Sequence, residues 1–357
     1  MFETTHKKLF IASVILLGSS LNGNLQAAEN TLSSIKIDST VILDGVAEPL
    51  WQKASALQVK VDKLPYQANN YSGIKETQVS LKSLYDNEHI YFLVQYSDPT
   101  KSLQRFPWQK QSDGQWKQLK DKDQTGHSNN YYEDKFAFFW DIKAPGFAKK
   151  GCAVACHLVN DDGKINGIDQ KGKTAGRKYT RRAGETLDMW HWKSVRMNPL
   201  GIIDDQFVDH VKDPAVNKNW GRHGDSKTGG GYVNNTNKDK SGPAFMNRTQ
   251  DGLNDFTIVP SQKTPFVDTF KSGDLIPGIM SEVFTGSRGD IWAKGNWENG
   301  VWTIEIKRKL VTTGDKANSQ DVQFTDLSKI YPFAISVFDN SQINHVYHDG
   351  SLALSFK

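Results

Sequence analysis

The segment 151–157 restricts the fold of this chain more than any other feature of its sequence. It holds Cys152 and Cys156, the only cysteines among 357 residues, and His157 follows the second cysteine directly. Covalent haem attachment needs two sulfurs that add to the vinyl groups at one edge of a porphyrin, and a neighbouring histidine that can turn beneath the iron. The motif therefore predicts one covalently bound c-type haem, with His157 as an iron ligand.

The spacing within this motif is unusual. Two residues commonly separate the cysteines of such a motif, whereas three separate them here, Ala153, Val154 and Ala155. Because these side chains are small, the extra residue can bow outward without a clash against the porphyrin edge. A local disulfide is the main alternative, since an oxidising compartment would favour it. A zinc site is less well supported, because it needs about four ligands and only three candidate side chains cluster here.

The first residues predict export from the cytoplasm. Two lysines precede the apolar run 9–17, and small residues follow around Ala27. This order of basic start, short apolar core and small-residue cleavage site is typical of a secretory signal. We therefore expect residues 1–27 to be a cleaved signal and 28–357 to be a single periplasmic domain. No later apolar run approaches the roughly 20 residues that a membrane span needs.

Residue patterns near both ends of the chain predict β-strands. The run 90–96 is rich in β-branched and aromatic residues, and Trp302, Ile304 and Ile306 alternate with polar residues. The middle of the chain has little periodicity. We therefore predict a mainly β fold, an immunoglobulin-like or sugar-binding-module-like β-sandwich, with a long insertion of loops and short helices at about 143–271 that encloses the haem. The formal net charge of +4, without a basic arm, gives no indication of nucleic-acid binding.

The opposite face of the iron needs a second ligand, and the residues alone leave its identity open. Histidine or methionine would each give a stable low-spin centre. Two clusters, 188–193 and 344–349, supply the strongest candidates. Their members that could ligate iron are Met189, His191, His345 and His348.

Two indoles flank His191 in the first cluster. Trp190 and Trp192 are predicted to contact the haem, since indole rings pack well against a porphyrin face. The alternative is that they form an aromatic core patch and do not touch the cofactor.

Taken together, these motifs resemble a known family. The segments that carry the resemblance are Phe138-Phe-Trp140-Asp141-Ile142, Ala144-Pro-Gly-Phe147, the cysteine–histidine motif, Met189-Trp-His-Trp-Lys193 and Asn198-Pro199-x-Gly201. Over most of its length the chain is similar to the ethylbenzene dehydrogenase-type haem-binding family. That family includes the haem-carrying gamma subunits of periplasmic molybdenum enzymes for ethylbenzene and dimethyl sulfide, together with stand-alone c-type relatives.

The resemblance also implies where the second ligand lies. In the gamma subunits a methionine and a lysine hold the haem noncovalently on a β-sandwich. The cysteine motif falls about where the family has this methionine, so His157 would replace it, and the lysine's region corresponds to the second cluster. His348 is therefore the expected second ligand, with His345, His191 and Met189 as alternatives.

The expected function is electron transfer in the periplasm. A single haem would pass electrons between a periplasmic redox protein, such as a molybdenum oxidoreductase, and another carrier such as a cytochrome. A haem-based sensor of a small ligand and a carbohydrate-binding module of the same fold are the alternatives. The sequence shows no acid–base constellation that would indicate an enzyme acting by itself.

Overall fold

The computed structural model describes residues 30–156, 178–213, 215–248, 256–314 and 316–357, together with the backbone at 164–165 and 168–169. The predicted signal 1–27 and His157 therefore lie outside the described residues.

Thirteen strands of the described chain form one sheet. In hydrogen-bonded order they are β12 (Arg222–Gly224), β11 (Asp204–Val208), β10 (Thr186–Lys193), β7 (Lys135–Lys143), β20 (Tyr331–Phe338), β22 (Leu352–Phe356), β1 (Thr31–Lys36), β3 (Thr77–Tyr85), β4 (His89–Ser97), β19 (Val301–Lys309) and β18 (Trp292–Glu298), while β2 (Leu57–Val61) pairs with β3 and β21 (Val346–Tyr347) pairs with β20. Strand β1 runs parallel to both of its neighbours, and the other pairs in this sheet are antiparallel.

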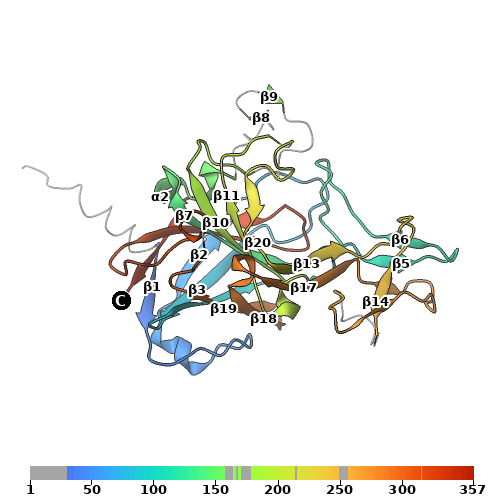
Figure 1. The fold of residues 1–357 in the computed structure, drawn as a ribbon, viewed down its shortest axis with the longest axis horizontal. Helices are drawn as coiled ribbons and strands as arrows, with labels where there is room; N and C mark the ends of the chain where they lie inside the picture. The colour runs from blue at the N-terminus through green and yellow to red at the C-terminus, as the bar shows by residue number, and fades with distance from the viewer. Residues whose placement is uncertain are drawn as a thin grey trace, which may run out of the picture.

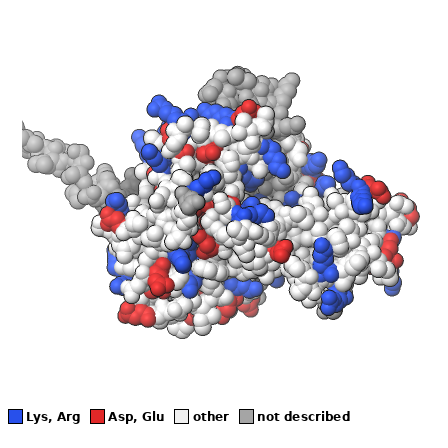
Figure 2. All heavy atoms as spheres, viewed as in Figure 1, with Lys and Arg blue, Asp and Glu red and all other residues white. Residues whose placement is uncertain are grey.

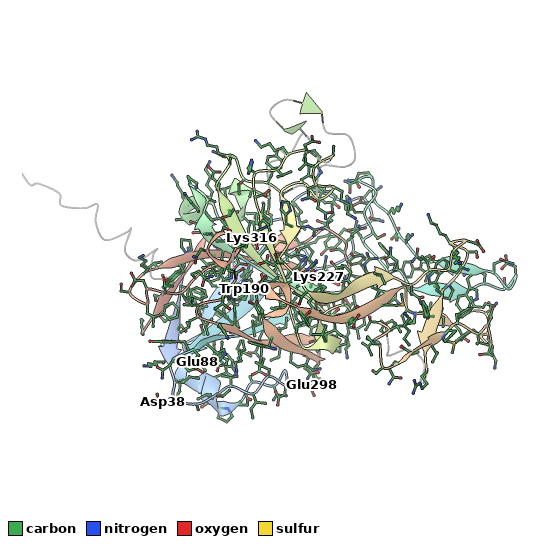
Figure 3. The ribbon with its side chains drawn as sticks, in the orientation of Figure 1. Asp38, Glu88, Trp190, Lys227, Glu298 and Lys316 are labelled. Atoms are coloured by element: carbon green, nitrogen blue, oxygen red, sulfur yellow. The ribbon has the colours of Figure 1, made fainter. Side chains whose placement is uncertain are left out.

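The sheet folds back on itself, so that its two halves pack face to face. Between ring centroids, Phe92 of β4 lies 5.1 Å from Phe138 of β7 and 5.8 Å from Trp190 of β10. Trp302 of β19 lies 5.0 Å from Trp192 of β10. Figure 3 shows Trp190 in the middle of the main body. The predicted mainly β sandwich is confirmed, and its core is unusually rich in aromatic rings.

Strands β10 and β11 lie inside the range 143–271, which the sequence indicated as an insertion. Both belong to the main sheet, because β10 pairs with β7 along its whole length and β11 pairs with β10. The remaining strands form small sheets, which are β5 (Trp108–Lys110) with β6 (Trp116–Gln118) and β16 (Leu275–Ile276), β13 (Gly229–Asn234) with β17 (Ile279–Thr285), β14 (Phe245–Asn247) with β15 (Lys263–Pro265), and β8 (Lys164–Ile165) with β9 (Ile168–Asp169). Figure 1 shows β5, β6 and β14 extending to one side of the main body.

The helices are short. They are α2 (Phe147–Lys150), α3 (Ala317–Gln320) and the 3₁₀ turns η1 (Pro49–Lys53), η2 (Cys152–Val154), η3 (Asn198–Leu200) and η4 (Ser287–Gly289). Within the described ranges, no helix has the length and apolar character that a membrane crossing requires.

Candidate functional site

One face of three adjacent strands, β7, β10 and β20, forms the floor of a cavity of about 690 Å³. Successive side chains of a strand point to opposite faces of the sheet. On β10, Met189, His191 and Lys193 line this cavity, while Trp190 and Trp192 belong to the sandwich core on the other face. The volume falls within the range of about 300–1,000 Å³ that is typical of cofactor sites.

Strand register arranges the floor of the cavity in three rows. The first row is apolar and consists of Met189, Phe139 and Ala334. The second row has mostly small side chains and consists of His191, Ala137 and Ser336. The third row is cationic and aromatic and consists of Lys193, Lys135 and Phe338. A strand rises by about 3.3 Å per residue, so the first and third rows lie roughly 13 Å apart. The floor therefore changes from apolar to cationic along the strands and has little side-chain bulk in its middle.

The two cysteines lie at the apolar end of this floor. Cys152 begins η2, and the amide N–H of Cys156 donates to the carbonyl oxygen of Cys152 at 2.8 Å, which closes one helical turn. Residues four apart on a helical turn share a face, and both cysteines line the cavity. They pack in one apolar cluster with Phe139 and Met189 of the first row.

The chemical state of the cysteines limits what they can do. Cys152 and Cys156, both within the described chain, are not joined by a disulfide. Burial raises the pKa of both thiols, that of Cys152 well above its ordinary value. A nucleophilic enzyme uses a thiolate of lowered pKa, so this pair does not fit a reactive-cysteine catalyst.

The loop that carries the cysteines is attached to the chain's last loop. Gly151 forms a parallel β-bridge with Gly350, and the hydroxyl of Ser351 donates to the carbonyl oxygen of Ala148 at 2.7 Å. The cysteine segment and the histidine-bearing segment 344–349 are therefore neighbours in space, although about 200 residues separate them in sequence.

Three histidines line the cavity, namely His127, His191 and His345. His191 is 7% exposed, and neither of its ring nitrogens has a hydrogen-bond partner. Burial, and then the charges of Lys193 and Lys135, lower the pKa of His191 well below its ordinary value, so the ring is neutral at physiological pH. His345 is 6% exposed, and its Nδ1 lies 2.8 Å from the carbonyl oxygen of Ile343. A hydrogen bond of this kind to one ring nitrogen is what commonly orients a metal-ligating histidine.

Three residues that the sequence indicated for the haem do not line this cavity. His348 does not line the cavity, and its Nδ1 lies 3.2 Å from the carbonyl oxygen of Lys60. Trp190 and Trp192 are fully buried in the sandwich core, because the alternation of β10 directs them away from the face that carries His191. The aromatic core patch, given above as the alternative, is how these two indoles are packed.

A comparison with known families identifies the family of the chain. The family model described as ethylbenzene dehydrogenase matches residues 48–350. The chain belongs to this family. The match includes the cysteine turn, the three floor strands and the three cavity histidines. A search of curated proteins found none that matches the chain.

Two solved structures illustrate what this family member is similar to. A carbohydrate-binding module of family 9 from Caldicellulosiruptor kristjanssonii, in complex with glucose, is 9% identical, with 92% of this chain and 95% of that chain covered and a TM-score of 0.33. A crystal structure described as a putative carbohydrate-binding protein from Bacteroides uniformis is 10% identical, with 92% and 99% covered and a TM-score of 0.32.

The cavity of this family member is strongly basic, which the sequence analysis missed. Among its described lining residues none is Asp or Glu, and seven are Lys or Arg, namely Arg105, Lys135, Lys178, Lys193, Arg196, Lys218 and Arg222. Figure 2 shows that acidic and basic side chains are instead interspersed over the visible outer face. The seven come from segments far apart in the chain, so no local charge run could have indicated them.

Several of these cations are buried without full compensation. Two guanidinium nitrogens of Arg105, Nε and one Nη, have no hydrogen-bond partner. Burial lowers the pKa of Lys193 to about 7, although this lysine forms an ion pair with Asp204, and burial lowers the pKa of Lys135 well below its ordinary value. Desolvated cations bind an anion favourably. The end of the cavity remote from the cysteines is therefore suited to carboxylate groups.

Proposed function

We propose that this protein is an exported, periplasmic c-type cytochrome that carries one haem and transfers electrons. The observation that carries the proposal is the polarity of the cavity. The cysteines Cys152 and Cys156 pack against the apolar first row of its floor, His191, which has no hydrogen-bond partner, lies in the middle row, and Lys135 and Lys193 lie in the third row. A further cation, Lys178, lies near the two thiols. A haem has the same polarity, since its vinyl groups are apolar and its two propionates are anionic.

Each part of the haem would then have a chemical partner in the chain. Cys152 and Cys156 would form the thioether bonds, His157 would ligate the iron from the adjoining segment, and Lys135 and Lys193 would offset the propionate charges. When bound, such a haem supplies one-electron transfer between ferric and ferrous iron. The small side chains of Ala137 and Ser336 in the middle row leave room for a flat group.

We assign the second iron ligand to His191 in place of His348. A buried imidazole without a hydrogen-bond partner is costly, by about 1–3 kcal/mol for each unsatisfied group, and coordination of iron by one ring nitrogen would remove part of that cost. His191 also lies between the apolar row and the cationic row, where the centre of a porphyrin would lie. His345 is the second candidate, because it also lines the cavity and the carbonyl oxygen of Ile343 orients its ring.

The partners of this cytochrome would be other periplasmic redox proteins. Family membership supports a molybdenum oxidoreductase as the electron donor or acceptor, with another cytochrome on the other side of the transfer.

The haem itself is tested by visible spectroscopy of the full-length protein, produced in a host that matures c-type cytochromes. We expect sharp low-spin bands, haem that stays on the chain after acid–acetone extraction, and a polypeptide mass increased by one haem. The double variant Cys152→Ser, Cys156→Ser should lose the haem on extraction. A colourless wild-type protein would refute the proposal and would favour the carbohydrate-binding alternative.

The second ligand is tested by three single variants. His191→Ala should convert the oxidised spectrum from low-spin to high-spin, since the iron loses one strong-field ligand. His348→Ala is the matched control and should leave the spectrum unchanged. If His345→Ala instead gives the high-spin spectrum, the assignment to His191 is wrong. High-spin bands in the wild type would favour a sensor of a small ligand.

A further inference from the structure

A second group of polar residues lies on the opposite face of β10 and β11 from the cavity. Asp188 of β10, Asp205 of β11 and Asp225, which follows β12, lie together with Asp290 and Asp321. Asp205, Asp225 and Asp321 are 0%, 3% and 1% exposed, and each offers a carboxylate oxygen that lies within 4.8 Å of the other two.

Strand pairing forces two of these carboxylates together. The amide N–H of Asp225 donates to the carbonyl oxygen of Asp205 at 3.1 Å, which continues the antiparallel pairing of Gln206 with Gly224. Residues that oppose each other in a ladder place their side chains on one face, about 5 Å apart. Asp321, the residue that ends α3, adds the third carboxylate from a distant part of the chain.

The oxygens of this cluster are largely without hydrogen-bond donors. The buried oxygens that lack a partner are Oδ1 of Asp188, Oδ2 of Asp205, both oxygens of Asp225, Oδ1 of Asp290 and Oδ1 of Asp321. The two oxygens of Asp188 differ in this respect. Its Oδ2 accepts hydrogen bonds from the indole of Trp190 and from the amide of Val322, both at 2.9 Å, whereas its Oδ1 accepts none. Natively buried polar atoms rarely lack a partner, so the unpaired oxygens indicate a missing positive group.

Nearby cations do not supply that group. Among the described residues, the ion pairs of these five carboxylates are with Arg308, whose Nη2 lies 3.8 Å from Asp188 and 3.7 Å from Asp321. One arginine faces five carboxyl groups, of which four belong to buried residues. The cluster must therefore either hold protons or bind a cation.

We propose that Asp205, Asp225 and Asp321 bind one hard divalent cation of the calcium type. All the donors are oxygens, which hard cations prefer to the nitrogen and sulfur ligands of transition metals. Calcium tolerates irregular geometry, whereas magnesium requires a near-octahedral set, and three carboxylates from three separate elements fit the first requirement better. The ion would join α3 and the segment after β12 to the edge of the sheet. This site does not depend on the proposed haem.

The test uses the full-length protein, dialysed against a chelator and then against metal-free buffer. We expect metal analysis of the protein before chelation to give about one calcium per chain. Thermal melting of the chelated protein should rise by about 5 °C on addition of Ca²⁺ at a large excess over its Kd. Addition of Mg²⁺ should have a smaller effect. Protein that contains no divalent metal and melts at the same temperature with chelator and with Ca²⁺ would refute the site, since its carboxyls would then hold protons.

Variants locate the ion. Asp225→Asn should abolish the Ca²⁺-dependent rise in Tm. Asp204→Asn is the matched control, because Asp204 is the buried neighbour of Asp205 on β11 and pairs instead with Lys193 and Arg288. It should lower Tm but keep the response to Ca²⁺. A response that survives Asp225→Asn would place the ion elsewhere and overturn the proposal.

A second measurement serves if Asp225→Asn does not fold. Tb³⁺ substitutes for Ca²⁺ at oxygen sites, and the indole of Trp190, which bonds to Asp188, should sensitise its luminescence in the wild-type protein. Added Ca²⁺ should quench this signal by displacement. Absence of sensitised luminescence would count against the site.

Discussion

His191 is a residue whose burial destabilises the fold but suits the role of iron ligand proposed for it. Its ring lacks hydrogen-bond partners, and burial, followed by the charges of nearby lysines, lowers its pKa and keeps it neutral. A neutral imidazole is the form that binds a metal. The same surroundings that make burial of His191 unfavourable would suit it to the role of iron ligand proposed above.

Gly151 is the residue on which the position of the cysteines depends. Its φ is +54°, and an added Cβ would lie 1.8 Å from the carbonyl oxygen of Gly350. Both the left-handed backbone and the bridge to Gly350 therefore exclude a side chain here.

Gly151→Ala should lower the Tm and the yield of haem-loaded protein. Gly184→Ala is the control, because Gly184 has a φ of +82° but no atom within 4 Å of an added Cβ. In the control, the free energy of unfolding should fall only by the cost of an alanine in the left-handed conformation, about 1–2 kcal/mol. If denaturant unfolding shows that the two variants lose equal amounts of unfolding free energy, the contact with Gly350 is unimportant.

At the scale of elements, β10 divides the molecule between two environments. Its even-numbered residues Trp190 and Trp192 complete the sandwich core, and its odd-numbered residues form the cavity floor. Asp188 belongs to the first set and reaches the acidic cluster. Because the period of a strand is two residues, one strand contributes to the core, the cavity and the cluster.

The middle row of the floor offers a steric test of the cavity. Ala137→Leu adds three carbons to β7 beside His191, so the haem content per chain should fall severalfold while the apoprotein still folds. Ser336→Ala is the control, since it removes only a hydroxyl from the same row, and it should retain the haem. Haem absorbance relative to protein absorbance, with circular dichroism as a check on folding, measures the effect. Full haem content in Ala137→Leu would mean that the haem does not lie on this floor.

At the scale of the whole molecule, Glu305 joins a late strand, β19, to the early segment 44–51. It is fully buried on β19 and accepts hydrogen bonds from the indole of Trp51 at 2.9 Å and from the amides of Asp44 and Gly45 at 3.0 Å. The N-terminal segment is thereby held against the outer face of the sheet.

Glu305 also makes stability depend on pH. Burial raises its pKa from 4.5 to about 7 in the folded protein. Between these values the unfolded chain has released this proton while the folded chain retains it, so the contribution of Glu305 to stability is present at low pH and is lost as pH rises. The Tm difference between wild type and Glu305→Gln should therefore favour the wild type most near pH 4.5 and shrink towards pH 7. A difference that stays constant over this range would contradict the prediction.

The sequence by itself determined much of this protein. The alternating apolar runs indicated a mainly β sandwich, and the motifs at 138–147 and 189–201 indicated the family. The haem that the cysteine–histidine motif predicts stays a prediction. These features are local, because a strand's pattern and a motif's spacing are carried by consecutive residues.

Tertiary structure decided what depends on residues far apart in the chain. Sequence alternation separates Trp190 from His191, but only the packing of the second sheet half determines which face becomes core and which becomes cavity. Likewise, the bridge from Gly151 to Gly350 orders the last loop so that His345 lines the cavity and His348 does not. The basic lining and the buried acidic cluster arise from strand pairing between distant segments, whose partners a single sequence does not specify.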